Sequence, residues 1–149
     1  MILSIPIHTF DDKYVFFSDV TKNIVISDSI FMRIYYSTDL FTMNGLFLSF
    51  PLEIYNVEKS YNKIKCLFKI NNNIDTFNTI KNIEYIIINK LNIERKRPVY
   101  AITKQLQEEY IKLYDINIID RGSTSNIICK ISGICDDGSN FGLTYKFMT

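Results

Sequence analysis

The sequence predicts a mainly β domain with one long helix, an α+β arrangement that fits an OB-like antiparallel β-barrel or a small sandwich with an inserted helix. Three observations predict it. Short runs of branched and aromatic residues with alternating polarity fill both ends of the chain, one central stretch has a helical period, and no repeat or low-complexity linker divides the 149 residues. This length and the 47% of hydrophobic residues fit a single β-rich domain, residues 1–149.

The residues before the helical stretch predict strands. Asn44-Gly45 lies between two apolar runs, and both residues accept the positive φ of a type I′ turn. We therefore expect a hairpin in Ile30–Phe50 that turns at this pair. We expect Pro51 to interrupt the second strand and Leu52–Tyr61 to continue as an irregular extended segment. Shorter strands are expected at Ile2–His8, Tyr14–Phe17 and Ile24–Ile26.

A half-buried strand is predicted at Asn62–Ile70, because its residues alternate between charged and apolar. Beyond it, apolar residues recur at three- and four-residue steps from Phe77 to Leu91, which predicts an amphipathic helix. Asp75 is the expected N-cap, the cations of Arg95–Arg97 favour the C-terminal end, and Pro98 marks the end of the helix.

A second short helix and then further strands are expected after this helix. The short helix is expected in Ala101–Glu109, with Ile102 and Leu106 facing inward. Alternating residues then predict strands, and a turn at Asp136–Ser139 joins the last two of them. These strands are expected within Tyr110–Tyr114, Ile127–Ser132 and Leu143–Phe147.

Residue types that carry catalysis are sparse. The one histidine, His8, has no nucleophile motif to serve and is more readily a structural or surface residue. The pairs Asp11-Asp12 and Asp136-Asp137 are candidate ligands of a divalent metal, although Asp is common in such turns. We therefore expect no enzymatic activity, no cofactor and no metal. The cysteines lack the close pairing of zinc ligands and are expected to be free thiols: Cys66, Cys129 and Cys135.

The charge balance limits the class of partner. With 17 basic and 16 acidic residues the net charge is +1, so a nucleic-acid surface would have to be a local patch. No stretch approaches the about 20 apolar residues that span a bilayer, and no membrane partner is expected. The odd number of cysteines at no disulfide-like spacing indicates a reducing compartment.

Basic and aromatic residues are interleaved on several predicted strands. Such a face suits a single strand of nucleic acid, because bases stack on aromatic planes while Lys and Arg meet phosphates. The Arg95–Arg97 cluster could add a phosphate clamp. Antiparallel sheets also expose Lys and Tyr for structural reasons, and this alternative stays open. The candidate nucleic-acid-binding residues are Arg33, Tyr35, Lys63, Lys65, Lys69, Tyr110, Lys112, Tyr114, Lys130 and Lys146.

Two segments, FMRIYYSTDLFTMNGLFLSF at Phe31–Phe50 and CKISGICDDGSNFGLTYKFM at Cys129–Met148, resemble small proteins of nucleocytoplasmic large DNA viruses. They cover under a third of the chain. The resemblance implies an OB-like single-stranded DNA-binding protein that supports genome replication. In the related pattern an aromatic residue follows the Ser-Gly-Ile stretch, whereas Cys135 stands here, so no base-stacking role is assigned to that position.

The sequence thus leads to two hypotheses. The first is a viral single-stranded DNA-binding protein with little sequence specificity, located in the host cytoplasm or nucleus at viral replication sites. The second is a structural or assembly protein of a virus particle, which would contact a second copy of the chain or another viral protein. A basic, aromatic surface favours the first, and aromatic residues gathered without lysines favour the second.

Overall fold

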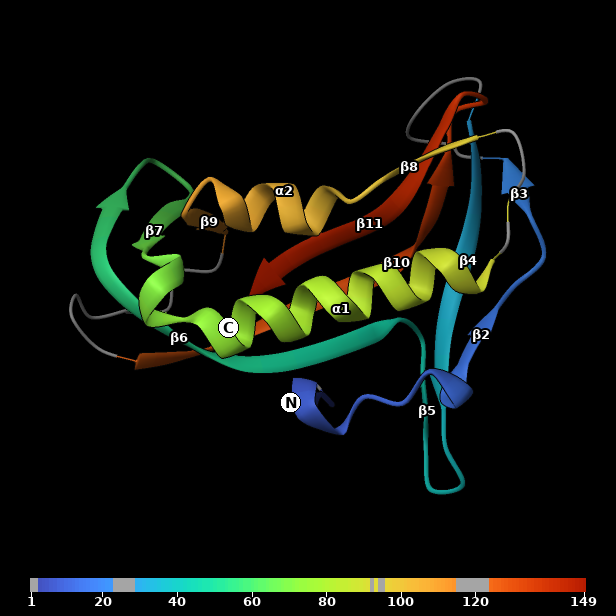
Figure 1. Cartoon of the computed structure of the whole chain (residues 1–149), viewed down its shortest axis with the longest axis horizontal. Coiled ribbons are helices and arrows are strands. Elements are labelled where there is room, and N and C mark those ends of the chain that lie inside the picture. The colour runs from blue at the N-terminus through green and yellow to red at the C-terminus, as the bar shows by residue number, and fades with distance from the viewer. Residues whose placement is uncertain (1–2, 23–28, 92, 94–95, 115–123) are drawn as a thin grey trace.

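The computed structural model describes residues 3–22, 29–91, 93, 96–114 and 124–149. Two helices, α1 (Ile74–Lys90) and α2 (Ala101–Gln107), lie on one side of a strongly curved sheet (Figure 1). Single 3-10 turns occur at Ile7–Thr9, Asp12–Tyr14 and Ile70–Asn72. The strands are β1 (Ile5–Pro6), β2 (Val15–Phe17), β3 (Thr21–Lys22), β4 (Ile30–Ser37), β5 (Thr42–Met43), β6 (Leu46–Lys59), β7 (Ile64–Phe68), β8 (Arg97–Val99), β9 (Tyr110–Leu113), β10 (Thr124–Asp136) and β11 (Asn140–Met148).

The sheet is open and mainly antiparallel. Its strand order is β2-β4-β10-β6-β7-β9, and β11 pairs with β10 on the opposite edge from β6 and β4. Among the described residues, the parallel pairs are β1 with β6 and β8 with β11. The α+β prediction is therefore confirmed at the level of a strand-rich sheet with helices, while an OB-like or closed-barrel topology stays a prediction.

The long strand β6 connects two parts of the sheet. Its first half pairs with β10 and its second half with β7, with an irregularity between Ile54 and Asn56. The prediction that Pro51 interrupts this strand was wrong. Pro51 is exposed on the outward side, and every second residue from Leu46 to Ile54 is buried, so the burial of this face keeps the strand regular through the proline.

The hairpin predicted at Asn44-Gly45 is also corrected. The chain reverses earlier, between β4 and β5, where the Thr38 hydroxyl accepts hydrogen bonds from the backbone N–H of Leu40 and Phe41. Among the described non-glycine residues only Glu109 has a positive φ, so Asn44 does not supply the type I′ conformation. Gly45, at φ 113°, instead redirects the chain into β6, where a Cβ would lie 3.3 Å from the Ile131 carbonyl oxygen.

At the N-terminus, only part of the predicted strand Ile2–His8 forms. Strand β1 covers Ile5–Pro6, and a 3-10 turn follows directly and leaves His8 exposed on the surface. The strand predicted at Tyr14–Phe17 is confirmed as β2, whereas Ile24–Ile26 lies outside the described residues. The predicted strands Asn62–Ile70, Tyr110–Tyr114, Ile127–Ser132 and Leu143–Phe147 are confirmed as β7, β9, β10 and β11.

Helix α1 packs its apolar face against the sheet. Ile80, Ile83, Ile87 and Ile88 are buried in one core with the inward residues of the strands, as the helical spacing predicts. The predicted N-cap Asp75 was wrong, because the helix begins at Ile74 and Asp75 lies in its first turn. Asn73, the residue before the helix, does not cap it with its side chain either.

That residue, Asn73, instead ties the helix start to β6. Its buried side chain accepts a hydrogen bond from the Glu53 N–H and donates to the carbonyl oxygens of Glu53 and Lys69. Bonds to the backbone of other elements satisfy the amide more fully than a local cap would. The packing of the helix on the sheet, rather than its local sequence, fixes where it begins.

Helix α2 is fastened to α1 by a buried carboxylate. Glu84 on α1 is fully buried and accepts hydrogen bonds from the backbone N–H of Ile102 (2.8 Å), the N–H of Thr103 (2.8 Å) and the Thr103 hydroxyl (2.7 Å). These are donors at the start of α2 that lack partners within their own helix. The second helix predicted at Ala101–Glu109 is thereby confirmed, with Ile102 and Leu106 buried.

The three cysteines form no disulfide in the described part of the chain, as predicted, and they differ in exposure. Burial raises the pKa of Cys66 to about 11, and burial together with the nearby Glu84 charge raises that of Cys129. Cys135 is half-buried at the end of β10. Because the thiolate is the nucleophile, the two buried thiols are held in the unreactive protonated form.

We expect Cys135 to react first with iodoacetamide at about pH 8, with Cys66 and Cys129 modified only after unfolding. Unfolded thiols lose their proton near the ordinary value of 9.0, whereas folded Cys66 keeps its proton to about pH 11. The stability that this proton contributes is therefore complete below about pH 9 and is lost as the pH rises through 11. Peptide mass spectrometry measures the order of labelling, and rapid labelling of Cys66 in the native protein would contradict it. Urea titrations at several pH values measure the change in stability.

Candidate nucleic-acid interface

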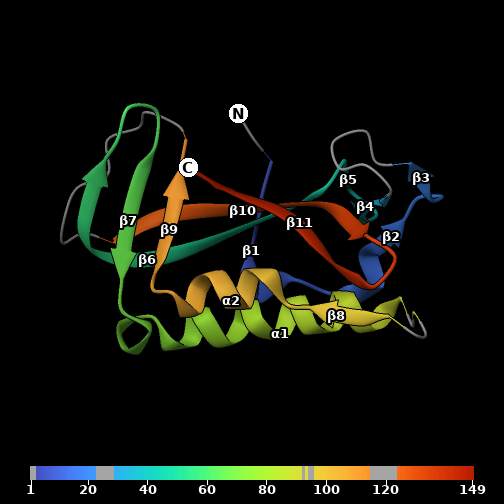
Figure 2. The ribbon, with the colours of Figure 1, turned by 90° about the horizontal axis from the view of Figure 1, so that it is seen from above.

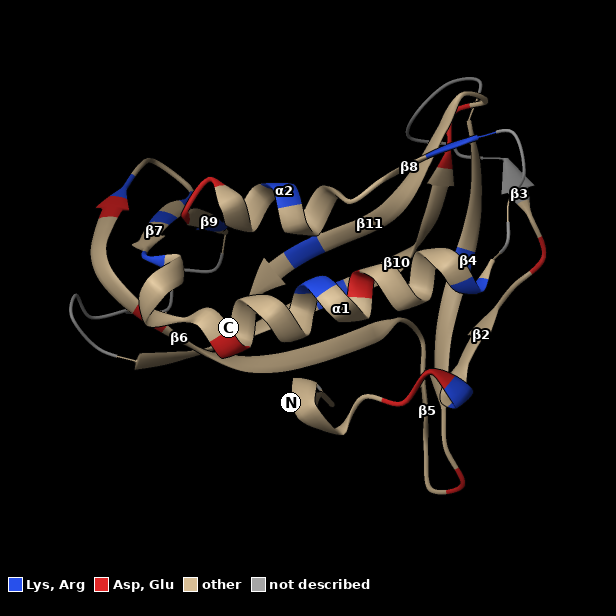
Figure 3. Cartoon of the chain, in the orientation of Figure 1, with Lys and Arg blue, Asp and Glu red and all other residues tan. Residues whose placement is uncertain are grey.

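The outer face of the sheet is the side that points away from α1 and α2. Strand alternation places one set of side chains in the core under the helices and the other set on this outer face. The predicted residues lie at separate places along it, and Figure 3 marks lysine and arginine positions on β7 and β11. The cross-strand register shows which of them are neighbours.

The densest group, here called the β7–β9 cluster, consists of Lys63, Lys65, Lys69, Tyr110, Lys112 and Tyr114. Its centre is a direct cross-strand pair, Lys65 on β7 opposite Lys112 on β9. The Lys65 ammonium lies 4.4 Å from the Tyr110 ring centroid and the Lys112 ammonium 5.8 Å from it. Two cations therefore flank one outward ring.

The remaining members of this cluster lie at the strand ends. Lys69 follows β7, and its ammonium is 5.4 Å from the ring centroid of Tyr55 on β6. Tyr114 follows β9 and is 51% exposed, while Lys63 precedes β7 in the turn where its carbonyl oxygen accepts a bond from the Ser60 N–H. Cations and rings thus continue past the ends of both strands.

A second group, the β10–β11 cluster, consists of Phe47, Lys130 and Lys146. Lys130 on β10 pairs with Phe47 on β6 on one side and with Lys146 on β11 on the other, so the three form one row across three strands. The Lys130 ammonium is 5.6 Å from the Phe47 ring centroid. This row repeats the combination of ring and cation found on β7 and β9.

Arg33 and Tyr35 lie on β4, beside the second group. The Arg33 guanidinium donates to the Asn44 side-chain oxygen (3.1 Å), close to the start of β6, and lies 6.0 Å from the Phe31 ring. The Phe31 ring covers Gly133, where a Cβ would lie 2.6 Å from it. Tyr35 pairs with Phe16 of β2, further from the lysines.

The structure does not gather these residues into one groove. The strand β6 runs about 35 Å from Phe47 to Glu58, at about 3.3 Å per residue, before it reaches the β7–β9 cluster. The sheet curves in between, so that β7 and β9 run across the direction of β10 and β11 (Figure 2). The residues form two basic, aromatic groups on one curved outer face, with Arg33 extending the second.

Sequence reasoning missed two exposed tyrosines near the β7–β9 cluster. Tyr55 lies at the irregularity of β6 and is 43% exposed, and Tyr61 stands fully exposed in the turn between β6 and β7. Both fall in Leu52–Tyr61, which was predicted to be irregular. The strand alternation that continues through Pro51 is the pattern that would have placed Tyr55, and the lysines on both sides of Tyr61 would have singled out that ring.

Two acidic residues of β6 reduce the positive potential of the face: Glu53, which is exposed between the two clusters, and Glu58. Glu58 is opposite Lys65, with 4.0 Å between the carboxylate and the ammonium. Both side chains are well exposed, so the ion pair contributes little to stability. Within the described residues, Lys112, Lys130 and Lys146 form no ion pair. Their charges remain available to an anionic partner.

The Arg95–Arg97 clamp is not supported by the contacts of Lys96, which is ion-paired with the buried Asp136. Arg95 lies outside the described residues, and Arg97 begins β8. Asp136 also accepts a bond from the Gly138 N–H. Because Lys96 is paired with this carboxylate, its charge stabilises the turn and is not available to a phosphate.

The aspartate pairs are likewise used in local structure. Asp137 accepts bonds from the N–H groups of Ser139 and Asn140, which lower its pKa, and Asp11 accepts from the Lys13 N–H. The described part of the chain contains no cluster of three His, Cys, Asp or Glu residues that could hold a metal ion. These contacts are those of turn-forming aspartates.

No described helix is both long enough and apolar enough to cross a bilayer. Comparison of the chain with protein-family models, curated proteins and solved structures finds no match. The resemblance to viral proteins therefore stays a prediction, and the arrangement of side chains on the outer face carries the functional argument.

Proposed function

We propose that the protein binds single-stranded nucleic acid, with DNA as the expected ligand, on the outer face of its sheet. Binding is non-catalytic and has little sequence specificity, because phosphate contacts and ring stacking do not read base edges. The observation that carries the proposal is the Lys65–Tyr110–Lys112 arrangement, repeated in the row of Phe47, Lys130 and Lys146.

The energies favour exchange of the internal cation–ring contacts for contacts with a ligand. An exposed cation over a ring is worth about 0.5–1 kcal/mol. A base stacked on the same ring is worth about 1–3 kcal/mol, and the displaced ammonium gains a phosphate. The lysines that lie over Tyr110 in the free protein are therefore placed to move onto the backbone of a bound strand.

The two groups suggest a path for the strand. It would cross the β7–β9 cluster and follow the curved outer face of β6 toward the β10–β11 cluster and Arg33. Binding sites of related size in single-strand-binding modules cover about 4–16 nucleotides. A short oligonucleotide should occupy one cluster, and a long one should reach both.

The test is a fluorescence-anisotropy titration of labelled oligo(dT) with the protein at several salt concentrations. We expect affinity to fall as salt rises, with a logarithmic slope of about 0.7 for each phosphate that a cation neutralises. A double-stranded competitor should displace the strand poorly. Absence of binding at low salt would overturn the proposal.

Tyr61→Ala should weaken oligo(dT) binding by about fivefold without changing stability, since one stacked base is worth about 1 kcal/mol or more. The ring is fully exposed, so its removal leaves no cavity. Anisotropy and the urea midpoint measure the two effects. Tyr61→Phe, which retains the ring, is the matched control, and equal loss in both variants would argue against stacking.

One observation favours a second candidate function, contact with another protein. Phe16 on β2 is 52% exposed and Leu40, in the turn between β4 and β5, is 91% exposed, and neither is in a cation–ring contact. Exposed apolar side chains suit a contact between proteins when they form one patch. Sedimentation of Phe16→Ser and Leu40→Ser variants tests it, and a wild-type protein that stays monomeric at high concentration would contradict self-assembly.

A further inference from the structure

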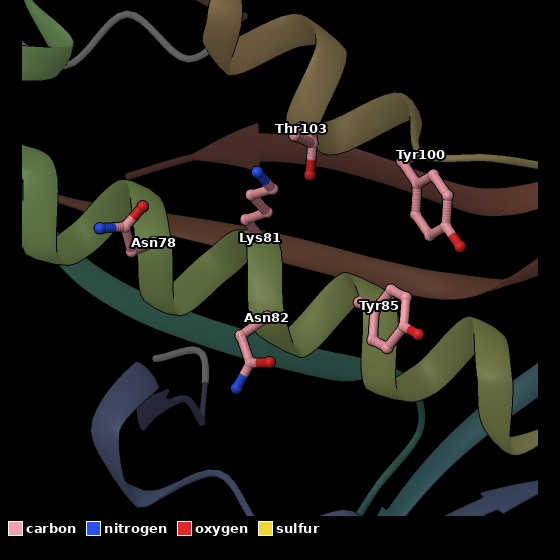
Figure 4. Close-up of a pocket in the computed structure, with 6 residues that line it drawn as sticks. All are labelled: Asn78, Lys81, Asn82, Tyr85, Tyr100 and Thr103. Carbon is pink, nitrogen blue, oxygen red and sulfur yellow. The ribbon is translucent and has the colours of Figure 1, made fainter.

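A cleft of about 290 Å³ opens between α1 and α2, on the helix side of the molecule and away from the outer face (Figure 4). Three groups line it: two tyrosine rings, one lysine and a set of uncharged polar side chains. The lining residues are Asn78, Lys81, Asn82, Tyr85, Tyr100 and Thr103.

The walls of the cleft are fixed by buried contacts. Thr103, in the wall formed by α2, is bonded through its N–H and hydroxyl to the buried Glu84 of α1. Tyr100 precedes α2 and stacks on Tyr85 of α1, with ring centroids 6.1 Å apart and planes 19° from parallel. Because both helices are joined under the cleft, it exists before any ligand arrives.

The two rings form an aromatic wall. Tyr85 is 56% exposed, whereas Ile83, Ile87 and Ile88 of the same helix are buried. The centroid separation leaves no room for a ring between the two tyrosines. A planar ligand would therefore stack on the open side of the pair or against its edges.

The polar groups of the cleft define the charge of the ligand. Lys81 extends from α1 toward Thr103 (Figure 4), and within the described residues it forms no ion pair or side-chain hydrogen bond. No acidic side chain lines the cleft in this part of the chain. The Glu84 carboxylate beneath it is buried and faces three hydrogen-bond donors of α2.

Asn78 and Asn82 lie one turn apart on α1 and belong to the lining, although the Asn82 amide points away from α2 (Figure 4). Neither side-chain amide has a partner among the described residues, so each keeps a donor and an acceptor for a ligand or for water. The volume is at the lower end of small-molecule sites, which span about 300–1,000 Å³. The cleft suits a small ligand that remains partly exposed.

We propose that this cleft binds a small planar aromatic anion, with its ring on the Tyr85–Tyr100 wall and its carboxylate or phosphate on Lys81. A nucleoside monophosphate and an aryl carboxylate share this chemistry. The site is independent of the nucleic-acid interface, since it lies on the opposite side of the sheet and uses none of its residues.

Isothermal titration calorimetry with four probes tests the proposal: adenosine 5′-monophosphate, 1-naphthoate, adenosine and inorganic phosphate. The ring and the charge act together, so we expect adenosine and phosphate each to bind at least about fivefold more weakly than the aromatic anions. Tighter binding of the monophosphate than of naphthoate would identify a nucleotide site, and the reverse an aryl carboxylate site. Absence of binding by both aromatic anions up to about 10 mM would overturn the proposal.

Variants locate the binding. Lys81→Met, which retains the aliphatic stem, should weaken both aromatic anions about three- to fivefold, and Tyr85→Ala about tenfold. Lys104→Met, on the exposed side of α2 and outside the lining of the cleft, is the control expected to change nothing. Unchanged affinity in Lys81→Met would overturn the proposal even if Tyr85→Ala failed to fold, and unchanged oligo(dT) binding in Lys81→Met would separate this site from the outer face.

Discussion

The double variant Lys112→Gln/Lys130→Gln should bind a 16-nucleotide oligo(dT) about 25-fold more weakly than the wild type at about 0.1 M salt. Each neutralised phosphate adds about 0.7 to the salt slope, and each lost contact costs about fivefold at this concentration. The logarithmic slope should fall by about 1.4. Both lysines form no ion pair within the described residues, so their removal leaves no orphaned acidic partner.

The matched control is Lys104→Glu on α2, which changes the net charge by the same amount on the helix side. If binding depended only on total charge, this control would lose as much affinity as the double variant. A four-nucleotide oligo(dT) provides a second comparison, because it can occupy only one cluster. The losses of affinity caused by the two substitutions should multiply for the long strand and not for the short one. The same loss of affinity for both strands would contradict a continuous path.

Glu84→Ala should lower the free energy of unfolding by about 3–5 kcal/mol, the largest stability effect expected from a single polar side chain in this protein. The carboxylate is fully buried and accepts three hydrogen bonds from Ile102 and Thr103. Without it, two backbone N–H groups at the start of α2 are buried without acceptors, and a cavity remains. Urea denaturation followed by circular dichroism measures the change.

Glu84→Gln provides the sharper comparison. It keeps the size of the side chain but turns an amide nitrogen toward an N–H donor, so we expect a loss of about 2–3 kcal/mol rather than full rescue. Glu53→Ala is the control, because the side chain of Glu53 is exposed and its contacts to Asn73 are made by the backbone. Full stability of Glu84→Gln would contradict the role of a carboxylate with two accepting oxygens.

The sequence predicts elements well where burial follows a local period. The lysines within and next to β7 show the alternation directly, and the isoleucines of α1 show the helical spacing; both elements are confirmed. The hairpin turn predicted at Asn44-Gly45 was wrong because the same pair of residues can form either a hairpin turn or a corner in the chain. The choice depended on β10, which pairs with β6 and lies about 80 residues further along the chain.

Contacts between distant segments also explain the rest of the site. Lys65 and Lys112 can be placed on outward faces from their own strands, but their direct pairing depends on β9 joining β7 rather than another edge. Glu84 has the helical position of an inward apolar residue, and the start of α2 that satisfies its charge cannot be identified from local sequence. The curvature of β6, which separates the two basic groups, likewise arises from its change of partner.

Ultraviolet crosslinking of a 16-nucleotide oligo(dT) to the wild-type protein, followed by mass spectrometry of tryptic peptides, tests the central claim most directly. The outer-face interface predicts crosslinks in the peptides that contain Tyr110, Tyr61 and Phe47, with protection of Lys65 and Lys112 from acetylation in the complex. Crosslinks confined to the peptides of Tyr85 and Tyr100, or acetylation unchanged by a saturating strand, would contradict it.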